Sequence, residues 1–159
     1  MPKQSAGLLL FRRKTGLEVF LVHPGGPFFA KKDAGAWTIP KGEFNDEEVA
    51  LAAAQREFLE ETSFPPRGPF LPLGSVKQSG GKLVHAWGCE GDLDPEKIES
   101  NTFTIEWPPK SDKQREFPEV DRAGWFSVEA AAEKINAAQI AFLERLRSLV
   151  DESSPPLVS

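Results

Sequence analysis

KGEFNDEEVALAAAQREFLEETSF occupies residues 41–64 and combines a helix-forming composition with an unusual concentration of acid. It holds seven carboxylates and one arginine, and three of the carboxylates, Glu57, Glu60 and Glu61, lie within about one helical turn. Like charges one turn apart repel each other, by about 0.2–0.5 kcal/mol per pair. The segment therefore predicts an acidic helix face that another group stabilises, and we expect that group to be a divalent cation.

The helix in this segment has a start signal, a buried face and a stop signal. Asn45 followed by Glu48 fits a capping box, in which Asn45 caps the helix and Glu48 reaches back to its backbone N–H. Apolar residues at helical spacing predict the buried face, namely Leu51, Ala54 and Phe58. Two prolines beyond Ser63 end the helix.

Two apolar runs precede the acidic segment, at residues 5–11 and 17–23. They predict neighbouring strands, joined as a hairpin and buried on at least one face. Residues 24–36 are expected to form a loop because glycine and proline punctuate them, and residues 37–40 form a brief extended piece that leads into Gly42.

Further strands are predicted beyond the helix. Residues 70–78 and 82–90 flank a Ser-Gly-Gly turn and predict a second hairpin. Apolar and polar side chains alternate in residues 101–107, which predicts a half-buried strand. We expect residues 108–123 to form a polar loop.

The C-terminal part predicts a short strand at residues 124–126 and then a second helix. Asn136 with Gln139 fits a capping box at the start of that helix. Its apolar face is expected to contain Phe142, Leu143, Leu146, Leu149 and Val150. The chain shows no linker or repeat, so we expect one domain over residues 1–151 and a flexible tail at residues 152–159.

Composition limits the classes of function. A chain of 159 residues with 40% hydrophobic and 27% charged residues is typical of one globular domain. The net charge of −5 makes nucleic acid an unlikely partner, although Mg²⁺ would let an acidic site take a small polyanion. The single cysteine, Cys89, fits a reducing compartment, and no apolar run is long enough for a signal peptide or a membrane span. We expect a cytoplasmic protein with no membrane partner, and the sequence leaves the oligomeric state open.

The spacing of Glu57, Glu60 and Glu61 places their carboxylates on one side of the helix. Hard divalent cations prefer oxygen ligands, and Mg²⁺ often bridges protein carboxylates to substrate phosphates. A solvated acidic face would have the same spacing. These three positions alone therefore leave both interpretations open.

The wider spacing favours a metal site. From Gly42 to Phe64 the chain reads G-x5-E-x7-R-E-F-x-E-E-x-S-F. This pattern resembles the Nudix box, G-x5-E-x7-R-E-U-x-E-E-x-G-U, where U is an apolar residue. Every defining position matches except the last glycine, where Ser63 stands. The preceding WTIPKGE also resembles the usual lead-in to this box, and the resemblance to the family's plan extends over residues 5–150.

The resemblance implies an α/β fold, an α/β/α sandwich around a mixed β-sheet. It also implies hydrolysis, dependent on Mg²⁺ or Mn²⁺, of a nucleoside diphosphate linked to another group. The implied metal ligands are Gly42, Glu57, Glu60 and Glu61, with Glu57 and Glu61 as the principal ones. The implied catalytic set is Glu48, Arg56, Glu57 and Glu60, in which the Arg56–Glu48 pair braces the loop–helix–loop. The family glycine typically ends the helix in the left-handed conformation, which Ser63 can adopt at a cost of about 1 kcal/mol.

A pyrophosphohydrolase also needs a general base and groups that hold the substrate. In this family the base can be a box glutamate, here Glu57 or Glu60, or a glutamate from a later loop, here Glu116 or Glu119. The sequence leaves this choice open. The candidates for substrate binding are Lys41, Lys32 and Trp87: the lysines for phosphate and the tryptophan for stacking, although core packing would also explain Trp87. Phe28 or Phe29, in the loop at residues 24–36, is a further candidate for stacking on a base.

The substrate is less well defined than the chemistry. A nucleoside triphosphate or a dinucleoside polyphosphate is our first expectation, although this chain has no tyrosine where diadenosine polyphosphate hydrolases usually carry one. An ADP-ribose hydrolase would be expected to show a proline where Ser79 and Gly80 stand. The alternatives are a regulatory module that binds a nucleotide without turnover, an RNA 5′-end pyrophosphohydrolase, and a structural protein with an acidic interaction helix.

Overall fold

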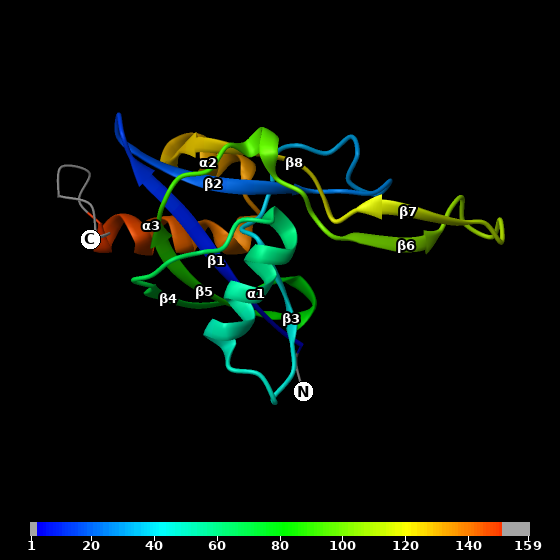
Figure 1. Ribbon diagram of the computed structural model, residues 1–159, viewed down its shortest axis with the longest axis horizontal. Helices are drawn as coiled ribbons and strands as arrows, with labels where there is room; N and C mark the ends of the chain where they lie inside the picture. The colour runs from blue at the N-terminus through cyan, green and yellow to red at the C-terminus, as the bar shows by residue number, and fades with distance from the viewer. Residues whose placement is uncertain (1–2, 151–159) are drawn as a thin grey trace.

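The computed structural model of the chain describes residues 3–150 and contains a mixed β-sheet with helices on both faces (Figure 1). The strands of this sheet are β1 (Gln4–Arg13), β2 (Leu17–Pro24), β3 (Lys41–Phe44), β4 (Leu71–Lys77), β5 (Leu83–Glu90) and β8 (Val120–Ser127). Their order is β4-β5-β1-β2-β8, and β3 also pairs with β1. β1 runs parallel to β5 and antiparallel to β2 and β3. The α/β/α sandwich around a mixed sheet is confirmed, and the predicted tail at residues 152–159 lies outside the described residues.

Three α-helices cover the sheet: α1 (Ala50–Thr62), α2 (Val128–Lys134) and α3 (Ile140–Leu149). Single turns of 3-10 helix occur at Ser79–Gly81, Pro95–Lys97 and Ala137–Gln139. Between residues 3 and 150, no helix is long and apolar enough to cross a membrane.

β1 divides the core into two clusters because its side chains alternate between the two faces of the sheet. Leu9 and Phe11 belong to the cluster covered by α2 and α3. Leu8 and Leu10 belong to the cluster covered by α1, together with the buried Phe58 of that helix. The nearly continuous apolar run of β1 is therefore explained by burial on both faces.

Both predicted hairpins are present. β1 and β2 pair antiparallel, and β4 and β5 pair antiparallel around the Ser79–Gly81 turn. The strand predicted at residues 101–107 is β6 (Thr102–Glu106). Its apolar side chains are half-buried and its polar ones exposed, as expected.

The predicted start of the first helix is wrong. α1 begins at Ala50, and its N-cap residue, Val49, offers no side-chain hydrogen bond. The side chain of Asn45 instead accepts from the backbone N–H of Glu47 at 2.9 Å, so it stabilises a turn before the helix. Glu48 does not reach back to Asn45, because Arg56 binds its carboxylate.

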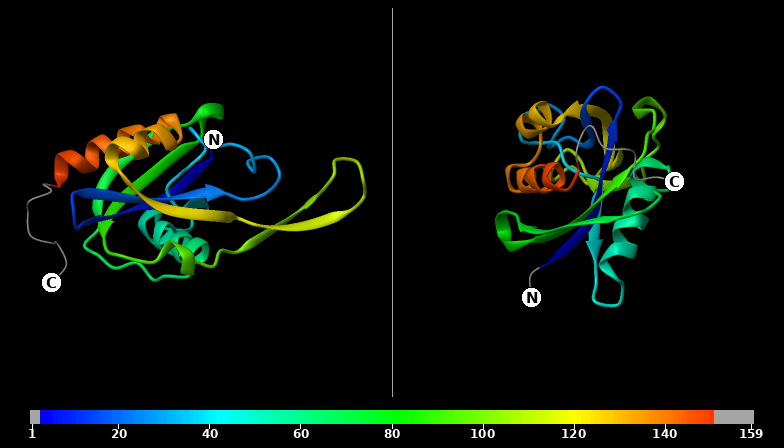
Figure 2. Two further views of the ribbon diagram at one scale, coloured as in Figure 1. Left: turned by 90° about the horizontal axis from the view of Figure 1, so that it is seen from above. Right: turned by 90° about the vertical axis from the view of Figure 1, so that its left-hand side faces the viewer.

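The loop predicted at residues 108–123 is also wrong. It contains a further strand, β7 (Gln114–Pro118), which pairs with β6 in a two-stranded sheet, and β8 begins at Val120 rather than at position 124. Most β7 side chains are exposed, so the strand has no alternating pattern to reveal it. The β6–β7 hairpin extends away from the main sheet (Figures 1 and 2).

The C-terminal helices differ from the prediction at their start. α2 is capped by the side chain of Ser127, which accepts from Ala130 N–H at 3.1 Å, and its seven residues were not predicted. Asn136 caps the 3-10 turn before α3, but Gln139 is buried and takes no part in a capping box. The predicted apolar face of α3 is buried except for Leu149, which is 56% exposed.

Candidate functional site

The strand β3 and the helix α1 pack so closely that Gly42 has no room for a side chain. A Cβ atom placed at position 42 would lie 1.8 Å from Oε1 of Glu57. A side chain at position 42 would therefore displace the Glu57 carboxylate from its place against the β3 backbone. The local sequence thereby places a carboxylate of α1 directly against the backbone of β3.

Glu57 and Glu61 lie one turn apart on α1, and each is only 8% exposed. Burial raises the pKa of Glu61 well above its usual range, and the negative charges of Glu57 and Glu119 raise it further. The ammonium and the backbone N–H of Lys41 act in the opposite direction. The helix therefore keeps two carboxylates in a place where their negative charge is poorly solvated.

Arg56 bridges three carboxylates. Its Nε and Nη2 atoms donate to the two oxygens of Glu48 at 2.8 and 2.9 Å. Its Nη1 atom donates to Glu57 at 2.5 Å and lies 3.4 Å from an oxygen of Glu60.

The hydrogen bonds to Glu48 are the largest cause of the raised pKa of Arg56, and they lower the pKa of Glu48. Burial raises the pKa of Glu57, and Arg56 opposes that effect. The contact expected between Arg56 and Glu48 is thus present.

A chain of main-chain hydrogen bonds brings Glu119 to this helix from a distant part of the sequence. The carbonyl of Glu60 accepts from Asn101 N–H at 3.0 Å, and the carbonyl of Asn101 accepts from Glu119 N–H at 2.8 Å. The carbonyl of Glu119 then accepts from Gly25 N–H at 2.9 Å. Burial, and next the charge of Glu60, raises the pKa of the Glu119 carboxyl.

These segments enclose a cleft of about 280 Å³. Lys41, Glu61 and Glu119 give one part of its lining a charged character, whereas Phe29 and Phe103 give it aromatic surface. Burial lowers the pKa of Lys41, and the nearby ammonium of Lys82 lowers it further. A cleft with clustered carboxylates, a lysine and aromatic side chains suits a phosphorylated ligand bound through a metal ion.

Comparison with protein families tests the resemblance that residues 42–64 show to the Nudix box. A model described as NUDIX domain matches residues 1–146. The chain belongs to the Nudix family. The family resemblance drawn from residues 42–64 is therefore confirmed, and the cleft lies beside the Nudix box.

Solved structures with the same fold include other Nudix proteins. An Ap4A hydrolase of C. elegans, in a binary complex, is 20% identical, with a TM-score of 0.64 over 91% of this chain and 96% of that one. The NUDIX domain of Shewanella oneidensis NrtR, complexed with ADP ribose, is 17% identical, with a TM-score of 0.64 over 95% and 90% of the two chains. A mutT/nudix family protein from Listeria innocua is 20% identical, with a TM-score of 0.61 and 94% of each chain covered. A search of curated protein sequences found no match.

The acidic residues of this Nudix domain have the chemistry of a site for Mg²⁺ or Mn²⁺. Their donors are all carboxylate oxygens, which hard divalent cations prefer. Among residues 3–150, no three acidic, histidine or cysteine side chains already converge in ligand geometry, and Arg56 binds the Glu57 carboxylate. The buried carboxylates of Glu57 and Glu61 nevertheless fit a cation, because a positive ion would offset both the burial and the repulsion by Glu57 that raise the pKa of Glu61.

The other predicted site residues are spread over the domain. Lys32 is exposed on the loop after β2, and its Nζ atom lies 5.4 Å from the centre of the Phe29 ring. Glu116 is exposed on β7 and does not line the cleft, unlike Glu119. Trp87 packs against the α1-side cluster and also lies outside the cleft lining.

On the aromatic side of the cleft, the sequence offers Phe28 or Phe29 as a stacking group, whereas Phe103 is not predicted for the site. Phe103 was placed on the apolar side of a strand, but a period of two does not show which surface that side meets. Phe29 lies in an irregular loop, where no periodic pattern applies. Only the tertiary structure brings these two rings to the same cleft.

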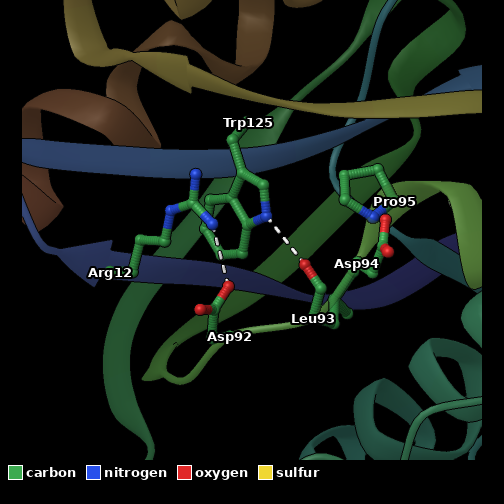
Figure 3. A pocket seen from close by; sticks show the side chains of 6 residues that line it. All are labelled: Arg12, Asp92, Leu93, Asp94, Pro95 and Trp125. Atoms are coloured by element: carbon green, nitrogen blue, oxygen red, sulfur yellow. Dashed lines mark hydrogen bonds and ion pairs between the residues drawn. The ribbon is translucent and has the colours of Figure 1, made fainter.

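A larger depression of about 470 Å³ lies away from the Nudix box, beside β1 and β8 (Figure 3). Its polar groups bond to one another. The guanidinium of Arg12 stacks 4.1 Å from the centre of the Trp125 ring and donates to Asp92 at 2.8 Å. The indole N–H of Trp125 donates to the carbonyl of Leu93 at 3.0 Å. Since these groups already have partners, we assign the chemistry to the smaller cleft.

Proposed function

We propose that this protein is a divalent-metal-dependent pyrophosphohydrolase that cleaves a nucleoside triphosphate or a dinucleoside polyphosphate. The burial of Glu57 and Glu61 on α1 carries this proposal. Burying like charges is costly unless a positive partner compensates them. A cation shared with a substrate phosphate would provide that compensation at the site where the chemistry occurs.

Each residue of the site then has a role. Glu57, Glu60 and Glu61 would hold the cation, together with the Gly42 carbonyl, and Arg56 orients the carboxylates with Glu48 as its anchor. When bound, the cation neutralises phosphate charge and lowers the pKa of an attacking water.

The proton from that water needs an acceptor. Glu119 lines the cleft and its carboxyl pKa is raised, so it is better placed for this role than the exposed Glu116. Lys41 lines the same cleft and, with Lys32, is assigned to the substrate phosphates. A nucleotide substrate agrees with the relatives of the same fold, which include an Ap4A hydrolase and a domain complexed with ADP ribose.

A second candidate is a module that binds a nucleotide without cleaving it. The observation in its favour is the 2.5 Å hydrogen bond from Arg56 to Glu57, which occupies a carboxylate that the metal would need. Hydrolysis requires that carboxylate to become available when metal and substrate bind. A binding module does not require it.

The test is a turnover assay in millimolar Mg²⁺ that follows release of phosphate or pyrophosphate. The panel contains canonical and oxidised nucleoside triphosphates, diadenosine polyphosphates, ADP-ribose, nucleotide sugars and RNA with a 5′-triphosphate. Glu57→Gln and Glu61→Gln should each lower kcat/KM by about 10²–10⁴-fold, because each removes a ligand charge that the reaction needs. The matched control is Glu133→Gln, an exposed glutamate on α2, which should leave turnover unchanged.

The two candidate functions predict different results. Turnover of one substrate class that both substitutions abolish would support the pyrophosphohydrolase. Nucleotide binding without turnover of any panel member would support the binding module instead.

A further inference from the structure

The loop after β2 and the β6–β7 hairpin are packed together as one wall of the cleft. A Cβ atom at Gly25 would lie 2.0 Å from the carbonyl oxygen of Pro118, at the end of β7. A Cβ atom at Gly26 would lie 2.7 Å from the ring of Phe103, on β6. Neither glycine has room for a side chain, so the backbone of the loop lies directly on the hairpin. Figures 1 and 2 show both segments at the same end of the sheet.

A pair of aromatic rings joins the two segments further from the cleft. Phe28 of the loop meets Trp107 of the hairpin edge to face, with their ring centres 5.5 Å apart. Phe28 is 62% exposed, so this contact lies near the surface. The neighbouring Phe29 lines the cleft together with Phe103.

The aromatic surface and the charged groups line the same cleft. Phe29 is 38% exposed, and the ammonium of Lys32 lies 5.4 Å from its ring centre. Lys41, Glu61 and Glu119 supply the charged lining. A ligand with a planar ring and a polyphosphate matches this combination, because the ring stacks on an aromatic face while the phosphates meet lysines and a metal.

The uncharged polar groups in the lining already have hydrogen-bond partners, and the charged ones, Lys41, Glu61 and Glu119, are assigned above to the phosphates, the cation and the proton. The hydroxyl of Thr38 accepts from Gln139 Nε2 at 2.9 Å and donates to the carbonyl of Ile39. The N–H of Gly25 donates to the carbonyl of Glu119. Within residues 3–150, no asparagine, glutamine, serine or arginine side chain lines this cleft. Strong discrimination between bases requires such hydrogen-bonding groups, whereas stacking tolerates every base.

We infer that Phe29 is a stacking platform for the nucleobase and that the cleft accepts nucleoside polyphosphates with little regard to the base. This inference rests on the proposed nucleotide ligand and adds its substrate range. Phe29 binds the base, Phe103 supports the wall, and Lys41 of the same lining meets the phosphates. Phe29 is a specificity-determining residue with no role in bond cleavage.

The test measures binding, so that it does not depend on turnover. Imido analogues of ATP, GTP, CTP and UTP are titrated into the protein in millimolar Mg²⁺ by calorimetry. The four dissociation constants should agree within about tenfold, because stacking differs little among bases. Phe29→Ala should weaken all four by about 5- to 100-fold, and Phe29→Trp should restore the affinity. Leu149→Ala, at an exposed position on α3, is the matched control and should change nothing.

Two results would overturn the inference. One is a preference for a single base of more than about 100-fold, which would mean that the base edge is read. The other is an unchanged affinity in Phe29→Ala. If the base-tolerant binding pattern holds but no triphosphate is hydrolysed, the stacking role stands and the proposed hydrolysis fails.

Discussion

The two faces of the central sheet are built from the same strands but carry different kinds of helix. On one face, α3 places Phe142, Leu143 and Leu146 against the sheet, all almost completely buried. On the other face, α1 buries Phe58 in the same way, and it also buries the carboxylates of Glu57 and Glu61.

The difference shows that the α2–α3 face of the sheet contributes to stability, whereas the α1 face also carries the candidate functional groups. The α2–α3 face buries apolar side chains that gain free energy by leaving water. The α1 face gives up part of that gain, because carboxylates prefer water to an interior position. Substitutions on the two faces should therefore have opposite effects on stability, and only those of the buried carboxylates on the α1 face should lower activity.

The largest expected effect on stability is on the apolar face. Phe142→Ala should lower the free energy of unfolding by about 3–5 kcal/mol, because it removes a buried ring and leaves a cavity. The activity per folded molecule should stay unchanged, since the ring does not line the cleft. Urea unfolding, with turnover measured at a protein concentration corrected for the folded fraction, checks both statements. A large loss of specific activity with intact folding would show that the two faces are not independent.

A smaller effect with the opposite sign is expected on the acidic face. With chelator present, Glu61→Gln should raise the melting temperature by about 3–6 °C, because it removes a buried negative charge that faces Glu57 and Glu119. Addition of Mg²⁺ should then stabilise the variant less than the wild type. Thermal melts with and without Mg²⁺ measure both, with Glu133→Gln as the exposed control. A fall in the melting temperature in chelator would mean that the Glu61 carboxylate stabilises the metal-free fold.

The smallest effect is expected at the end of α1. Ser63 has a φ of 66°, in the left-handed region, and its N–H donates to Leu59 at 2.8 Å as the helix ends. Ser63→Gly should stabilise the protein by about 0.5 kcal/mol, because glycine adopts this conformation without strain but loses more entropy on folding. Chemical denaturation measures the change, and turnover should stay constant. Destabilisation would show that the hydroxyl of Ser63, which donates to the Thr62 carbonyl at 2.5 Å, contributes more than the strain costs.

The parts of the fold that sequence could predict are those with a local pattern. Runs of apolar residues identified β1, β2, β4 and β5, and the spacing of the box residues identified the helix that carries Glu57. α2 and β7 were missed, because one has only seven residues and the other is exposed on most of its positions. Neither therefore has a period long enough or apolar enough to be recognised.

Only the part of the candidate site that lies within residues 41–64 could be predicted from the sequence. The glutamates of α1 follow from the box, and the close approach of Glu57 explains why position 42 is a glycine. The start of the helix was wrong because Glu48 has two suitable partners, and the sequence does not say that Arg56 outcompetes the backbone of Asn45. Phe29 and Phe103 come from segments far apart in the sequence, and no local rule brings them together.

The main-chain bonds that link Glu60, Asn101, Glu119 and Gly25 have a consequence for how this protein can diverge. Backbone groups are the same in every residue except proline, so these bonds survive most changes of side chain. Only Gly25 is restricted, by its contact with Pro118. The hydrogen-bonded backbone around the carboxylates can therefore be kept while most of its side chains change. A domain with only 20% identity has this same fold. Side-chain substitutions can therefore change which ligand the cleft binds without changing the backbone structure around it.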